Sequence, residues 1–325
     1  MYAKLMGTGQ YLPTKILSND ELAQHVDTSD EWIRQRVGII SRRIASPSET
    51  VVLMSTESAR IALNQANISP KSIDLIVVAT SSAEDRMPSV ASQVQRNLGI
   101  TSGCPAFDIS AACAGFLYGL NVVEQYLKSG AAKHVLLIGA ERMSRLIDWS
   151  DRSTCVLFGD GAGAAVFTMS PTPGILSTCI HSEGQYRELL FVDGGLPKDP
   201  FIRTEENIDL LSLKMEGNKV FKHAVNILAD VATEVLNKAG VRSSDIDWLV
   251  PHQANERIIS ATAKKLNLSM DKVILTLPEH GNTSAASVPL ALDSGIRSGK
   301  IKPGDLVLCE AFGAGFVWGA SLMRM

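Results

Sequence analysis

The sequence predicts an α/β protein in which two duplicated α/β halves form a layered α-β-α-β-α architecture. Residues 75–79 and 135–139 are short apolar runs without polar alternation, a pattern typical of strands buried on both faces. Residues 63–77 align without a gap with residues 236–250, and each segment ends an amphipathic helix, turns, and enters an apolar strand. Strands that alternate with helices in this way predict a parallel-cored sheet in each half.

Further elements support the duplication. Ser110–Cys113 pairs with Ser284–Ser287, each opening a helix, and Leu136–Glu141 pairs with Leu306–Ala311 as buried strands. The turn signal Pro171–Gly174 is the expected seam, which gives halves of residues 1–172 and 173–325.

Three local patterns predict further detail. Thr28–Glu31 has the form of a capping box that opens a helix. Leu117, Leu120, Val123 and Leu127 have helical spacing. Gly7–Gly9 and Gly159–Gly163 partly mimic a dinucleotide loop, but neither follows a strand and opens a helix, so close backbone packing is the favoured interpretation.

Bulk properties exclude several classes of protein. The chain has 325 residues, a net charge of −3 and a pI near 6.1, which argues against nucleic-acid binding. Its five scattered cysteines form neither a disulfide framework nor a CxxC metal pair. No apolar run approaches a membrane span, and the first residues lack the apolar core of a signal peptide. We therefore expect a cytoplasmic protein that uses no metal, nucleic acid or membrane.

A cysteine, a histidine and an asparagine stand in small-residue or turn contexts far apart in the sequence. Cys113 lies in Phe107–Phe116 between an apolar stretch and a helical pattern, His252 lies in Val250–Asn255, and Asn282 lies in His280–Pro289. A helix N-terminus and a histidine partner favour thiolate over thiol, so we expect a lowered pKa for Cys113. Each residue alone has a structural alternative, but together they indicate a nucleophilic site between the two halves.

These segments resemble the β-ketoacyl-acyl-carrier-protein synthase III family, the chain-initiating condensing enzymes of the thiolase superfamily. The resemblance also includes Gly7–Pro13, Asp27–Ile33, Phe158–Ala165 and Glu310–Gly319, so it covers essentially the whole chain. It implies the thiolase-like fold, with no cofactor beyond the substrates: a coenzyme A thioester and a phosphopantetheine-bearing acyl-carrier protein. The implied reaction is decarboxylative Claisen condensation of an acyl-CoA primer, expected to be acetyl-CoA, with malonyl-acyl-carrier protein.

The resemblance assigns catalytic roles to Cys113, His252 and Asn282, and an oxyanion hole to the backbone N–H groups of Cys113 and Ala314. Ala314 stands where the family often has glycine, so the hole requires that its φ is negative. The third catalytic residue separates relatives, because elongating synthases carry a second histidine. Two alternatives remain: a secondary-metabolism priming or head-to-head condensing enzyme of the same fold, and a non-catalytic carrier-binding scaffold.

The resemblance also implies contacts with both thioester substrates. The coenzyme A contacts would be Thr28, Trp32, Arg36, Arg152, Gly217, Phe221 and Asn255. From the residues alone, Trp32 is equally a core anchor and Arg36 a solvated charge. The acyl-carrier-protein surface would be Gln253, Ala254, Asn255, Glu256, Arg257, Lys264 and Lys265, although a solvated helix face is the ordinary interpretation of such spacing.

Met87 is the candidate acyl-pocket residue. In the family, the loop that corresponds to Glu84–Pro88 enters the active site of the other subunit of a homodimer, and phenylalanine often stands at this position. Methionine is flexible, so it could admit longer primers, or it could simply fill a gap.

Overall fold

The structure is a computed structural model that describes residues 1–193 and 212–325. The helices are α1 (Asn19–Leu22), α2 (Asp30–Val37), α3 (Val51–Ala66), α4 (Val90–Asn97), α5 (Gly115–Lys128), α6 (Arg152–Cys155), α7 (Gly217–Ala239), α8 (Glu256–Lys265), α9 (Leu277–His280) and α10 (Ser287–Arg297). The strands are β1 (Tyr2–Tyr11), β2 (Lys15–Ser18), β3 (Ser41–Ile44), β4 (Leu75–Ala79), β5 (Ala106–Ile109), β6 (His134–Arg142), β7 (Asp160–Ser170), β8 (Ile175–Ser182), β9 (Leu190–Asp193), β10 (Ser212–Met215), β11 (Trp248–Pro251), β12 (Leu306–Gly313) and β13 (Val317–Arg324).

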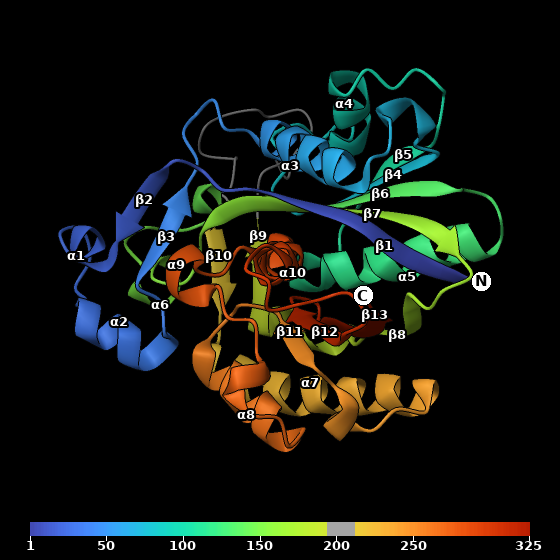
Figure 1. Ribbon diagram of the computed structural model, residues 1–325. Coiled ribbons are helices and arrows are strands. Elements are labelled where there is room, and N and C mark those ends of the chain that lie inside the picture. The colour runs from blue at the N-terminus through green and yellow to red at the C-terminus, as the bar shows by residue number, and fades with distance from the viewer. Residues whose placement is uncertain (194–211) are drawn as a thin grey trace.

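Five layers are visible in Figure 1, and they confirm the predicted α-β-α-β-α architecture. Helices α3 and α4 cover the outer face of one sheet, α5 and α10 lie between the two sheets, and α7 and α8 cover the outer face of the other. The central helices bury apolar side chains toward both sheets. Leu117, Leu120, Val123 and Leu127 of α5 are all buried, as their spacing predicted.

The two sheets have matching topologies. The first has the order β1-β7-β6-β4-β5, with β4 parallel to both β5 and β6. The second has the order β11-β12-β13-β8, with β11 parallel to β12 and the remaining pairs antiparallel. Reading the second order backwards superimposes β8, β13, β12 and β11 on β1, β7, β6 and β4. The parallel-cored sheet predicted for each half is therefore confirmed. Four residues separate the end of β7 from the start of β8, and the predicted seam lies among them.

The duplication holds at the level of single residues, with two shifts of register. Helices α3 and α7 both end in a left-handed residue, Asn67 and Gly240, and short 3-10 turns then lead into β4 and β11, as the alignment predicted. The predicted pairing of Ser110–Cys113 with Ser284–Ser287 is wrong by two residues. The left-handed Ala112 (φ 42°) and Ser284 (φ 49°) are equivalent, because each begins the 3-10 turn before a helix. Cys113 is therefore equivalent to Ala285.

The predicted pairing of Leu136–Glu141 with Leu306–Ala311 is also wrong by two residues, in the opposite direction. Ile76 lies opposite Leu136, whereas the equivalent residue of the second half, Leu249, lies opposite Leu308. Leu136 thus corresponds to Leu308 rather than to Leu306, and the same register makes Glu141 equivalent to Gly313. Both shifts arise because apolar and small residues repeat without a unique register.

Close packing explains the glycines that partly mimic a nucleotide loop. Gly159 precedes β7 and residues 160–163 lie within it, and a Cβ on Gly163 would come 2.7 Å from the Cβ of Pro289 in α10. A Cβ on Gly7 of β1 would come 2.5 Å from the backbone nitrogen of Ala66. The close-packing interpretation is confirmed at these positions.

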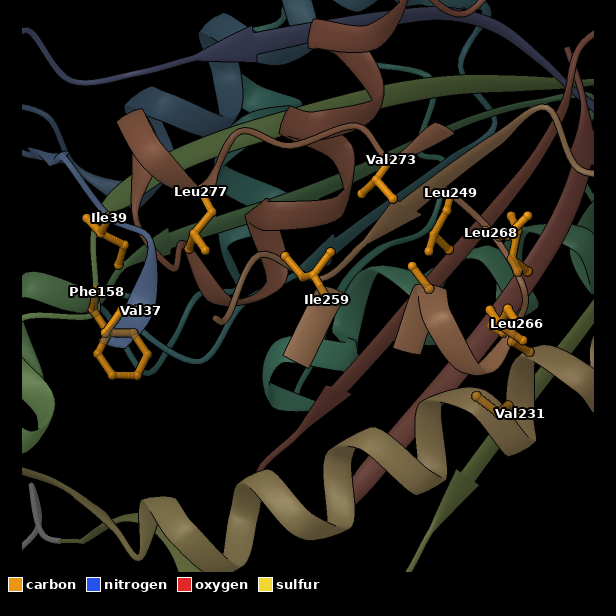
Figure 2. Close-up of a cluster of buried hydrophobic side chains, with 14 of the residues drawn as sticks. Val37, Ile39, Phe158, Val231, Leu249, Ile259, Leu266, Leu268, Val273 and Leu277 are labelled. Carbon is orange, nitrogen blue, oxygen red and sulfur yellow. The ribbon is translucent and has the colours of Figure 1, made fainter. Parts of the chain in front are cut away.

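The largest apolar cluster of the described residues joins the second sheet to the segment that contains α1 and α2. In Figure 2, Val37, Ile39 and Phe158 gather at one end, and the cluster continues through Ile259 of α8 to Val231 of α7. This packing fixes α2 beside the start of α8. Helix α2 begins one residue later than predicted, because the Ser29 hydroxyl, not that of Thr28, accepts the backbone N–H of Trp32.

Across the described residues, no helix combines the length and the apolar character that a membrane crossing requires.

Candidate active site

Cys113 lies on a sharp turn between a strand and a helix. Strand β5 ends at Ile109, Ala112 adopts a left-handed φ of 42°, and α5 begins at Gly115. Such a conformation is costly for a residue with a Cβ and persists only where the surrounding packing imposes it. Gly115 makes the tight turn possible, because a Cβ there would already approach the Cβ of Ala79 in β4 to 3.0 Å. The small residues leave the Cys113 thiol partly accessible at the wall of a cavity.

His252 follows β11, in a loop that a buried amide holds in place. The His252 N–H donates to the carbonyl of Glu310 on β12 (2.8 Å). Gln253 donates to the carbonyl of Pro251 (2.7 Å) and accepts the N–H groups of Thr276 and Leu277 (2.9 Å each). Gln253 is only 1% exposed, so the expectation that it faces the carrier protein is wrong. Its function is to fix the backbone on either side of His252.

Asn282 is held at both ends of its backbone and by its side chain. Its N–H donates to the carbonyl of Leu157 (2.8 Å), and its own carbonyl accepts the N–H of Gly159 (3.0 Å). Its Oδ1 accepts the backbone N–H of Ser284 (2.9 Å). This last bond fixes which way the amide is turned, so that Nδ2 is the end left to act as a hydrogen-bond donor.

Cys113, His252 and Asn282 line one cavity of about 1690 Å³, together with Phe312 and Ala314. The structure therefore brings the three residues together from two halves of the chain. The cavity is wide enough for a thioester arm, since ligand sites usually measure ~300–1,000 Å³.

Burial shifts the pKa values of two of these residues. It raises the pKa of the Cys113 thiol to about 12, the negative charge of Glu141 acts in the same direction, and a hydrogen bond with Ser284 opposes both. The expectation of a lowered thiol pKa is therefore wrong, because removal from water outweighs the hydrogen bonds that would lower the pKa. Burial also lowers the pKa of His252 to about 4, so its imidazole is neutral near pH 7. The resting site holds a neutral thiol and a neutral imidazole.

The turn after β12 lies against the backbone of Cys113. A Cβ on Gly313 would come 2.7 Å from the Cys113 nitrogen, so only glycine allows the two segments to approach this closely. Four non-glycine residues in the described chain have a positive φ, and Ala314 is not one of them. Ala314 therefore meets the requirement for a negative φ that the oxyanion hole places on it.

The predicted coenzyme A residues divide into those that line the cavity and those that do not. Trp32, Arg36, Gly217, Phe221 and Asn255 line the cavity, and Trp32 also packs against the largest apolar cluster, so it contacts both the cavity and the core. The Arg152 guanidinium lies 5.1 Å from the centre of the Trp32 ring, and that of Arg36 lies 6.0 Å away. Thr28 is not among the lining residues, and its hydroxyl is buried without a hydrogen-bond partner in the described residues.

The predicted carrier surface centres on α8. Arg257, Lys264 and Lys265 are exposed, and the Arg257 guanidinium stacks over the ring of Phe221 (5.4 Å). Ala254 and Asn255 are partly exposed just before the helix. Glu256 packs against α2, since a Cβ on Gly38 would come 2.3 Å from its carboxylate.

Met87 is 84% exposed, whereas residues 84–86 before it line the cavity. Glu84 anchors this segment through the N–H of Val51 (3.1 Å) and the guanidinium of Arg142 (3.5 Å). Sequence reasoning missed Glu141 and Ser284, two buried polar residues beside the cysteine. Their only local signal is a polar residue at the end of an apolar strand and a serine within the asparagine motif.

In the described residues, no group of three or more histidine, cysteine, aspartate or glutamate side chains could hold a metal ion.

Comparison with known proteins identifies the family. Residues 107–184 match the family 3-oxoacyl-[acyl-carrier-protein (ACP)] synthase III, and residues 236–325 match the family of its C-terminal part. The chain is 55% identical over 324 residues to β-ketoacyl-[acyl-carrier-protein] synthase III of Escherichia coli O1:K1 / APEC, with 100% of both chains covered.

Solved structures agree. The 3-oxoacyl-[acyl-carrier-protein] synthase III of Aquifex aeolicus VF5 matches with a TM-score of 0.92 and 48% identity, covering 99% of this chain and 100% of that one. The priming β-ketosynthase of the R1128 polyketide biosynthetic pathway matches with a TM-score of 0.94 and 38% identity, covering 99% and 96%. The chain belongs to the β-ketoacyl-acyl-carrier-protein synthase III family of acyltransferases.

Proposed function

We propose that this chain starts fatty-acid synthesis by condensing an acyl-CoA primer, expected to be acetyl-CoA, with malonyl-acyl-carrier protein. The products are 3-oxoacyl-acyl-carrier protein, coenzyme A and CO₂. One observation carries the proposal: Cys113, His252 and Asn282 meet at the wall of a single deep cavity whose lining also includes Trp32 and Phe221. An aromatic and cationic mouth above a buried thiol suits a thioester on a long arm.

In the first half-reaction, the sulfur of Cys113 attacks the carbonyl carbon of the acyl-CoA. Because both groups begin neutral, the thiol proton passes to the imidazole of His252 as the C–S bond forms. The backbone N–H groups of Cys113 and Ala314 stabilise the oxyanion. Collapse of this intermediate expels coenzyme A as a thiolate, which takes the proton back from His252.

In the second half-reaction, malonyl-acyl-carrier protein loses CO₂ and leaves an enolate. Negative charge gathers on the thioester oxygen, where neutral His252 and the Asn282 amide each donate a hydrogen bond. The enolate carbon attacks the acyl carbonyl on Cys113, and collapse of the tetrahedral intermediate breaks the C–S bond. The cysteine sulfur leaves as a thiolate and takes a proton from solvent to restore the neutral thiol. No base is needed to make the carbanion, because the departing CO₂ leaves its electron pair behind.

Both substrates would approach along the same side of the molecule. By resemblance, Trp32 and Arg152 would hold the adenine between them, with Arg36, Gly217, Phe221 and Asn255 along the arm, and Thr28 nearby. Arg257, Lys264 and Lys265 on α8 would attract an acidic carrier protein. Ala254 and Asn255 border that surface, and Glu256 reduces its positive charge.

A second copy of the chain would complete the acyl pocket. Among the described residues, strand β5 lies at the edge of its sheet and pairs with β4 alone, and an edge strand can pair with a strand of another chain. Met87 is largely exposed and does not line the cavity of its own chain, although residues 84–86 do. In a homodimer, Met87 would project into the partner subunit and limit primer length there.

The acyl group should be carried by Cys113. Labelled acetyl-CoA followed by peptide mass mapping should place the label on Cys113, and the Cys104→Ala variant should be labelled equally. Because the thiol pKa is about 12, alkylation by iodoacetamide should accelerate with each pH step through pH 10. Label on another cysteine would contradict this assignment, and an alkylation rate that levels off below pH 8 would contradict the raised thiol pKa.

His252 and Asn282 should serve decarboxylation more than acylation. Alanine at either position removes a donor that contributes on the order of 3 kcal/mol to transition-state stabilisation, so CO₂ release from malonyl-acyl-carrier protein should fall ~100-fold or more. Asn282→Ala should still transfer acetyl to Cys113, whereas His252→Ala should slow that step in part. If Asn282→Ala loses acylation yet keeps decarboxylation, the two roles are wrongly assigned.

Arg257→Glu should raise KM for malonyl-acyl-carrier protein far more than KM for acetyl-CoA, because a reversed charge repels an acidic partner. High salt should shrink the defect, since exposed charges are screened over ~10 Å at 0.1 M ionic strength. Lys71→Glu makes the same charge change on an exposed residue of the other half and should leave both values unchanged. An equal rise for both substrates would show that Arg257 supports the fold instead.

Met87→Phe should narrow the range of primers. Initial rates with acetyl-CoA and butyryl-CoA should show that the variant keeps the first and loses the second, because a rigid ring replaces a flexible chain. If the variant accepts butyryl-CoA as well as the parent protein does, Met87 only fills space.

A further inference from the structure

Glu141 is a fully buried carboxylate at the end of β6, and its hydrogen bonds join the two halves. Within the first half, it accepts the hydroxyl of Ser82, the backbone N–H of Ser81 (3.1 and 3.2 Å) and the hydroxyl of Thr80 (3.4 Å). From the second half, it accepts the hydroxyl of Ser284 (3.1 Å). The last bond spans the seam between the two duplicated units.

Ser284 stands between this carboxylate and two of the residues assigned to the chemistry. Its backbone N–H donates to Oδ1 of Asn282 (2.9 Å), which sets the direction of the Asn282 amide. Its side chain is also within hydrogen-bonding reach of the Cys113 thiol. Ser284 has a φ of 49°, a conformation that a residue with a Cβ keeps only where its neighbours hold it.

The internal symmetry of the fold shows which positions of the two halves correspond to each other at this site. Ser284 is the counterpart of Ala112, and Glu141 is the counterpart of Gly313, by the register of the two sheets. In one half, Gly313 lies against the backbone of the cysteine turn. In the other half, the equivalent position carries a carboxylate that binds the opposing turn. The second turn has no nucleophile, and it supports Asn282 instead.

We propose that Glu141 is a positioning residue for Asn282: its carboxylate anchors the side chain of Ser284, which holds the left-handed turn and fixes the Asn282 amide toward the substrate. This inference rests on the proposed function, because it requires that Asn282 acts in decarboxylation. A displacement of about 1 Å at a reacting group can reduce rate on the order of 100-fold.

The test measures the two half-reactions separately in Ser284→Ala, Glu141→Gln and Glu141→Ala. CO₂ release from malonyl-acyl-carrier protein should fall ~10- to 100-fold in Ser284→Ala and Glu141→Ala, and acyl transfer from acetyl-CoA to Cys113 should fall much less. Glu141→Gln keeps one oxygen acceptor and should recover part of that loss. The double variant Glu141→Ala, Ser284→Ala should lose no more than the worse single variant, because both single changes already remove the shared bond between Glu141 and Ser284.

Asp293→Asn is the matched control, since Asp293 is an equally buried carboxylate on α10 that bonds Thr8 (2.7 Å) and Arg297 (2.5 Å). It should lower the melting temperature without separating the two half-reactions. Equal losses in both half-reactions, or additive losses in the double variant, would overturn the inference. If the parent protein itself releases no CO₂, the proposed function fails instead. Ser284→Ala keeps the test decisive should the Glu141 variants fail to fold.

Discussion

The active site depends on two tight turns that face each other across the seam of a duplicated fold. Each turn contains one non-glycine residue in a left-handed conformation, Ala112 in the first half and Ser284 in the second. The end of the opposing half's central strand presses against each turn: Gly313 against the cysteine turn, and Glu141 against the serine turn. Each half therefore helps to hold the turn of the other half in place. The requirement that both sheets pack correctly links the stability of the fold to the geometry of the chemistry.

Burial at this seam decides the electrostatics. Removal from water raises the pKa of Cys113 and lowers the pKa of His252, so both groups favour their neutral forms. A neutral imidazole can accept the thiol proton in one half-reaction and donate a hydrogen bond in the other. One environment therefore supports both steps, and no change of protonation state is needed between them. Burial also raises the pKa of the adjacent Glu141 to about 7, so its carboxyl group carries less negative charge near neutral pH than an exposed glutamate would.

The fold and the three central residues were predictable from the sequence because their signals are local. Strand-to-helix transitions, glycine contexts and the pairing of residues 63–77 with 236–250 all lie within short segments. What failed depends on long-range contacts. The bond between Glu141 and Ser284 joins positions 143 residues apart, and nothing near either residue indicates the other. The resemblance placed Gln253 on the carrier surface, whereas its buried amide bonds backbone groups of other residues. The expected thiol pKa was wrong because burial cannot be read from a turn motif.

The central claim is that one buried site couples acyl transfer from coenzyme A to decarboxylation on the carrier protein. The most direct measurement follows the mass of the carrier protein together with released CO₂ and free coenzyme A, after mixing the chain with acetyl-CoA and malonyl-acyl-carrier protein. We predict acetoacetyl-acyl-carrier protein with CO₂ and coenzyme A in equal amounts, and no such product from Cys113→Ala. Acetyl transferred to the carrier protein without loss of CO₂, or product formation that survives Cys113→Ala, would contradict the account.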